Sequence, residues 1–163
     1  MFGDSPSLIG VLQSIADAIR GDRGQPAAAK YYATGNSGVL NYWQSFTYDA
    51  VEFQSGGLTK SGIYLKATIP GNYQVNVSAR AASGQVMPRV LVCDEAGAVQ
   101  NGKGFGGAVQ PAGSVAHCSG LVALKKDWSI VVQFGGGGTT NGQAGLPATD
   151  FDFANQVQMA LVK

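Results

Sequence analysis

Apolar and polar side chains alternate along much of the chain, which is the pattern of β-strands that bury one face. The alternation is clearest in residues 73–79. There, Tyr73, Val75, Val77 and Ala79 are expected to face a hydrophobic core, while the polar residues between them face outward.

Short β-rich runs bounded by Gly, Pro and Asn predict further strands. They are residues 62–69, 86–94, 115–124, 128–134 and 155–162, with two less regular strands between residues 31 and 53, around residues 42–46. A turn at residues 70–72 predicts that strands 62–69 and 73–79 are neighbours in space. Pro88 indicates an edge position or a bulge. Roughly eight short strands predict an all-β fold, an antiparallel jelly-roll sandwich.

The amino-terminal residues follow a helical period instead. Residues 5–20 predict a short α-helix, and the Gly-containing residues 21–26 predict a flexible joint behind it. Its apolar stripe consists of Leu8, Leu12, Ile15 and Ile19. The helix is too short to be stable alone, so it packs either on its own domain or on a symmetry mate or partner. The expected domains are the helix and joint, residues 1–24, and the jelly roll, residues 25–163.

The composition indicates a protein that assembles with others. Charged residues make up 13% of the chain, the formal net charge is +1, and there are 24 glycines. Such a balance argues against nucleic acid and anionic membranes as partners. No secretory signal or membrane-spanning apolar run is recognisable. A surface with so few charges is expected to be buried against other copies or another protein.

Catalytic chemistry finds little support in the sequence. His117 is the only histidine, and it lies next to Cys118 in a predicted strand, so the two side chains would face opposite ways. Cys93 and Cys118 are the only cysteines and are expected to be reduced. We therefore expect no catalytic residues, no metal site, no cofactor and no enzyme activity. A polysaccharide-cleaving enzyme that uses Asp150 and Asp152 is the least favoured alternative.

Three segments resemble the jelly-roll superfamily of the complement globular head and tumour necrosis factor. They are residues 69–73, which open a long core strand, residues 121–127, which lead into an apolar strand, and the closing segment that begins near residues 151–153. The resemblance covers about residues 45 to 163. It implies a compact sandwich that forms a homotrimer, with both chain ends close together at one base. The glycine run at residues 135–138 and its sequel are longer and more polar than in that family.

Residues 12–20 are similar to a helical phrase found in bacteriophage structural proteins. Together with a trimer-type jelly roll, they favour a homotrimeric capsid decoration or cement protein in the virion, assembled in the host cytoplasm and attached through its amino-terminal segment to the major capsid protein or another virion protein. One alternative is a tail or fibre tip that recognises a host glycan. Another is a free ligand-binding module like the complement head. The residues expected in an exposed binding loop are Gly135, Gly138, Thr139, Thr140 and Asn141.

Overall fold

The computed structural model describes residues 27–142 and 155–162, and this part of the chain is all-β. The strands are β1 (Ala28–Tyr32), β2 (Gln44–Ser45), β3 (Ala50–Ser55), β4 (Leu58–Ser61), β5 (Tyr64–Ala67), β6 (Gly71–Ser83), β7 (Gln85–Cys93), β8 (Phe105–Gly106), β9 (Gln110–Pro111), β10 (Val115–Leu124), β11 (Ser129–Gly135), β12 (Thr139–Thr140) and β13 (Gln156–Val162). The predicted helix and joint lie outside the described residues, so that prediction stays a prediction.

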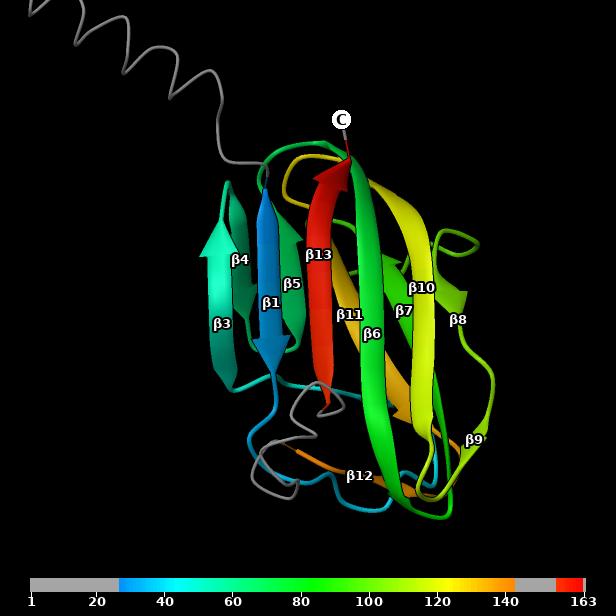
Figure 1. Cartoon of the computed structure of the whole chain (residues 1–163). Coiled ribbons are helices and arrows are strands. Elements are labelled where there is room, and N and C mark those ends of the chain that lie inside the picture. Colours follow the sequence, from blue (N-terminus) through cyan, green and yellow to red (C-terminus); the bar gives the residue numbers. More distant parts are fainter. Residues whose placement is uncertain (1–26, 143–154, 163) are drawn as a thin grey trace, which may run out of the picture.

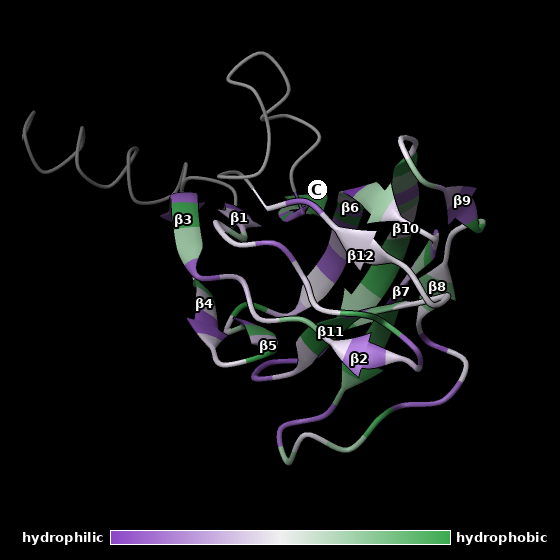
Figure 2. Ribbon diagram, turned by 90° about the horizontal axis from the view of Figure 1, so that it is seen from below, coloured by the Kyte–Doolittle hydropathy of each residue, from purple (hydrophilic) through white to green (hydrophobic). Residues whose placement is uncertain are grey.

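The strands form two antiparallel sheets that face each other (Figure 1). The first sheet has the order β10-β6-β13-β1-β3, with β12 paired to β6. The second has the order β4-β5-β11-β7-β8, with β2 paired to β11 and β9 to β7. Seen from below, the two sheets are separate layers (Figure 2). The expected antiparallel sandwich is therefore confirmed.

One predicted neighbourhood is wrong. Strands β5 and β6 were expected to be neighbours across the turn at residues 70–72, but they belong to different sheets: β5 pairs with β4 and β11, and β6 pairs with β10 and β13. The connection between them crosses from one sheet to the other, and the Tyr73 hydroxyl fixes this corner by donating to the Ile69 carbonyl at 2.6 Å. A Pro-Gly turn reverses the chain in a hairpin and in a crossover alike, so the sequence did not distinguish them.

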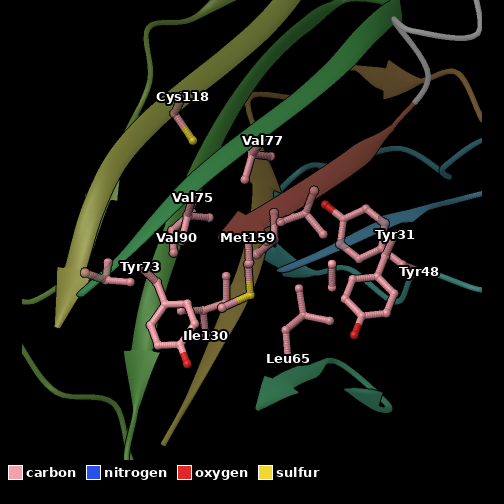
Figure 3. Packing of buried hydrophobic residues seen from close by; sticks show 14 of the residues in the cluster. Tyr31, Tyr48, Leu65, Tyr73, Val75, Val77, Val90, Cys118, Ile130 and Met159 are labelled. Carbon is pink, nitrogen blue, oxygen red and sulfur yellow. The ribbon is translucent and has the colours of Figure 1, made fainter. Parts of the chain in front are cut away.

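The hydrophobic core fills the space between the sheets (Figure 3). Tyr73, Val75, Val77 and Ala79 of β6 are all 0% exposed, so the predicted core face of this strand is confirmed. The neighbouring β13 contributes Val157 and Met159 in the same alternating manner. The second sheet contributes Val86, Val90, Val92, Ile130, Val132 and Phe134.

Pro88 lies in a strand with one well-paired side. Strand β7 pairs along its length with β11, whereas its other side meets only the two-residue strands β8 and β9. The Pro88 carbonyl accepts a hydrogen bond from the Gly107 amide at 2.9 Å. β7 is not the outermost strand, but the proline lies near the sheet edge, where its missing N–H costs little.

The beginning of β1 and the end of β13 lie side by side (Figure 1). Ala28 is opposite Ala160, and the Leu161 amide donates to the Ala27 carbonyl at 2.7 Å. The described chain therefore starts and finishes at the same end of the sandwich.

Candidate functional site

The outer surface of the first sheet carries almost no charge. We call it the uncharged sheet face and define it by the residues of β1, β6, β10 and β13 that alternate with the core residues. These are Ala28, Lys30, Tyr32, Asn72, Gln74, Asn76, Ser78, Arg80, Ala82, Val115, His117, Ser119, Leu121, Ala123, Gln156, Gln158, Ala160 and Val162. Within this set, only Lys30 and Arg80 carry a permanent charge. Its other members are small, polar or apolar.

A compact hydrogen-bond network ties two strands of this face together. The Ser119 hydroxyl donates to Asn76 Oδ1 at 2.6 Å, and Gln74 Nε2 donates to Ser119 Oγ at 2.8 Å. Gln74 Nε2 also lies 3.2 Å from Asn76 Oδ1. Side chains that are already paired lose fewer bonds to water when another surface covers them, so the network lowers the cost of burying this face.

A hollow of about 410 Å³ lies on the uncharged sheet face. Lys30, His117, Gln156 and Gln158 are among its lining residues. The ammonium group of Lys30 is 2.8 Å from the Glu52 carboxylate on β3, so its charge is offset within the chain.

Apolar side chains project from the same sheet. Leu121 is 62% exposed, Val162 48% and Phe53, which is opposite Lys30 on β3, 40%. A face that combines exposed aliphatic and aromatic groups with few charges has the composition of a protein–protein interface core.

The outer surface of the second sheet is different, because the chain covers part of it. Cys93, Ser129 and Val131 alternate with core residues and so point away from the core, yet they are at most 4% exposed. Trp43 lies against Gly135 of β11, where an added Cβ would be 3.3 Å from the indole ring. The segment around β2 therefore forms part of this cover.

A second hollow, of about 320 Å³, remains open on the covered side. We call it the Arg89 pocket; it is lined by Trp43, by residues 87–92 of β7, and by residues 99–102 and 104–107 of the following loop. The Arg89 guanidinium carbon is 3.9 Å from the Trp43 ring centroid. Arg89 Nε and Nη2 donate to Gln133 Oε1 at 2.8 and 2.6 Å, and Gln133 Nε2 donates to the Ser45 hydroxyl at 3.0 Å.

The two cysteines are buried and free of each other. Burial raises the pKa of the Cys118 thiol to about 12, and burial followed by the nearby Asp94 raises the pKa of Cys93. His117 is exposed while Cys118 is buried, so the two side chains do face opposite ways as expected. A thiol that is protonated near neutral pH and turned away from the histidine does not form a nucleophile–base pair.

The predicted binding loop is more closely packed than the sequence suggested. Gly135 and Gly138 are buried, and an added Cβ at Gly138 would lie 2.5 Å from the Gln85 carbonyl oxygen. Thr140 is 0% exposed; its amide donates to Ser37 Oγ at 2.7 Å, and its hydroxyl oxygen accepts from Asn155 Nδ2 at 3.2 Å. Thr139 and Asn141 are half-buried. That this segment binds a ligand stays a prediction.

The remaining candidates of the sequence analysis lie outside the described residues. They are Leu8, Leu12, Ile15 and Ile19 of the predicted attachment helix, and the carboxylates Asp150 and Asp152. Within residues 27–142 and 155–162, no group of three His, Cys, Asp or Glu side chains is placed to hold a metal ion. The same residues contain no helix that is long and apolar enough to cross a membrane.

Sequence reasoning missed the Arg89 pocket. The aromatic residues beside it do not belong to the core, since Tyr42 is 82% exposed and Trp43 is half-buried. The signal available was the outward position of Arg89 and Gln133 in their two strands. That these positions are paired in register becomes visible only in the folded sheet.

Solved structures resemble this fold. A crystal structure of murine APRIL superposes with a TM-score of 0.61 at 11% sequence identity, and the match covers 85% of this chain and 100% of that one. The globular domain of zebrafish complement 1qA superposes with a TM-score of 0.56 at 11% identity and covers 84% of this chain and 98% of that one. The chain has the jelly-roll fold of these proteins. No family model and no curated protein sequence matches the chain.

Proposed function

We propose that this chain is a structural assembly module that forms a homotrimer through its uncharged sheet face. The observation that carries the proposal is the contrast between the uncharged sheet face, which has two permanent charges, and the second sheet, where the outward-pointing Cys93, Ser129 and Val131 are buried by the chain itself. A second copy of the chain is the occupant that fits, because Leu121, Val162 and Phe53 would leave water on association.

The finer proposal is that the trimer decorates a bacteriophage capsid and is attached through residues 1–24. Its support is in the sequence, in the helical phrase at residues 12–20 and the apolar stripe of that segment. The proposal gives the molecule two separate tasks. The sheet face holds three copies together, and the amino-terminal segment holds the trimer to the shell.

Light scattering of the full chain tests the assembly step. The expected mass is three times the 16.8 kDa of the chain. Ser119→Arg places a charge in the hydrogen-bond network of the uncharged sheet face and is expected to yield monomers, because an unpaired charge resists burial. Thr59→Arg, at an exposed position of β4, is the matched control and should stay trimeric. A monomeric wild-type chain, or a trimeric Ser119→Arg variant, overturns the proposed interface.

Binding to undecorated capsids tests the attachment step separately. The full chain is expected to bind, and a chain that lacks residues 1–24 is expected to remain trimeric but to lose binding. Equal binding by both forms, or none by the full chain, would contradict attachment while leaving the trimer result intact.

A further inference from the structure

The Arg89 pocket lies on the sheet opposite the uncharged sheet face, so it would stay open in the proposed assembly. It forms where the loop after β7 runs back along the edge of that strand and pairs with it. This close approach requires a glycine at position 104, since an added Cβ there would collide with the Val90 carbonyl oxygen. The pocket is thus a built feature of the loop and does not depend on the sheet alone.

Arg89 supplies a positive charge that no acidic residue of the pocket offsets. It is the only charged side chain among the described lining residues. Its partner Gln133 is a neutral amide that engages two of the five N–H donors of the guanidinium, so three do not reach Gln133. The bonds to Gln133 and the stack on Trp43 hold the fork in one orientation. A fixed guanidinium with unused donors is suited to a carboxylate.

The rest of the pocket combines apolar walls with polar groups at the rim. Leu91, Val99 and Phe105 provide aliphatic and aromatic surface, and Val99 is 47% exposed. Asn101 is exposed at the edge and presents an amide. This mixture fits a ligand that has both a hydrophobic ring face and hydroxyl or amide groups.

The pocket holds one cation and so fits one carboxylate rather than a polyanion. Lys103 is on the same loop, but its ammonium group lies 4.6 Å from the Trp128 ring centroid, and Lys103 does not line the pocket. A sulfated polymer would find one positive charge where it needs several.

A peptide carboxylate fits less well, because the backbone beside the pocket is already paired. The Gln100 amide donates to the Val92 carbonyl at 2.8 Å, and the Gly107 amide donates to the Pro88 carbonyl at 2.9 Å. Strand β8 pairs with Arg89 and Val90. A peptide therefore finds no free strand edge along β7 to extend.

We propose that the Arg89 pocket binds a carboxylate-bearing sugar unit of a glycan. The guanidinium of Arg89 holds the carboxylate, the sugar ring lies over the wall formed by Leu91 and Val99, and the rim amide of Asn101 bonds its hydroxyl or acetamido groups.

We test the proposal by titrating the full chain with N-acetylneuraminic acid and with glucuronic acid. Amide chemical shifts in NMR spectra measure the binding. At least one of the acidic sugars is expected to produce saturable shifts in residues 87–92 and 99–107. The neutral sugar N-acetylglucosamine is expected to bind at least about tenfold more weakly, the ratio that follows from losing a charge-assisted hydrogen bond. N-acetyl-leucine serves as the peptide-carboxylate probe.

The variant Arg89→Gln should weaken binding of the acidic sugar about tenfold or more. Lys103→Gln also removes one positive charge, from the loop beside the pocket, and should leave binding unchanged. Circular dichroism confirms that both variants keep the fold. The proposal is overturned by equal loss in both variants, by full binding in Arg89→Gln, by binding of N-acetyl-leucine alone, or by the absence of saturable shifts with either acidic sugar. The mass of the trimer is measured independently, so this result and the assembly result do not depend on each other.

Discussion

The two outer surfaces of the sandwich differ in how far other segments of the chain cover them. On the second sheet, even outward-pointing residues such as Val131 are buried by the chain's own segments. On the first sheet, no described segment covers the outward side chains, and Leu121 is 62% exposed. Both sheets share one core. The comparison teaches that a strand's alternation shows which residues face inward but not what covers its other face.

The largest expected effect comes from the core that both sheets share. Met159→Ala in β13 and Ile130→Ala in β11 each remove a fully buried side chain and should lower the free energy of unfolding by about 2–5 kcal/mol. Chemical denaturation of the full chain measures this loss. Val109→Ala, at a 44% exposed position, should change it by no more than about 0.5 kcal/mol. A large loss in one sheet and none in the other would contradict a shared core.

A smaller loss in the free energy of unfolding is expected from a substitution between β11 and β12, where the chain passes from the second sheet to the first. Gly138→Ala would press a Cβ against the carbonyl oxygens of Ser83 and Gln85, and should cost about 1–3 kcal/mol. Thermal unfolding compares it with Gly38→Ala, where no atom lies within 4 Å of an added Cβ. If the two variants have the same midpoint, this connection is not closely packed.

Two glutamines separate the properties of the two surfaces. Gln133→Leu removes the acceptor that orients Arg89, and Gln74→Leu removes the donor that reaches Ser119 and Asn76; each should cost about 1 kcal/mol of stability. Gln133→Leu is expected to weaken acidic-sugar binding and leave the trimer unchanged. Gln74→Leu is expected to do the reverse. Sugar titration and light scattering on dilution measure both, and the opposite pattern would exchange the roles assigned to the surfaces.

The smallest expected effect is on pH dependence, in the chain between β2 and β3 that joins the two sheets. The side-chain hydrogen bond from Thr34 lowers the pKa of Asp49. Because the folded pKa lies below the unfolded one, this stabilisation is present above the unfolded pKa and is lost as pH falls through the folded pKa. Thr34→Val should raise the pKa of Asp49, as followed by NMR titration of its carboxyl carbon. Thr59→Val, at an exposed position, should not.

Local pattern in the sequence was enough to predict the longer strands β6, β7, β10, β11 and β13, because alternation is a property of neighbouring residues. It did not predict β4 or the two-residue strands β8, β9 and β12. The inward positions of β6 and β13 follow from it directly. Sheet membership does not, since the turn at residues 70–72 is compatible with a hairpin and with a crossover. The pairing of Arg89 with Gln133 joins residues 44 positions apart. No local pattern contains that register, so the Arg89 pocket was not predicted.

The exposed or buried state of a glycine-rich segment was equally hard to predict. Composition suggested an exposed loop at residues 135–141, because glycine and threonine are common in loops. In the fold, glycine at position 138 serves close packing against the carbonyl oxygens of Ser83 and Gln85. The absent side chain is a requirement of packing there, which composition alone does not reveal.

The side-by-side placement of Ala27 and Leu161 has a consequence for engineering. A linker of a few residues from position 162 to position 27 would close the described chain into a ring, and a new opening in the exposed turn near Gly102 would give a circular permutant. Because its two ends are adjacent, the sandwich could also be inserted into a surface loop of a host protein without separating the two ends of that loop.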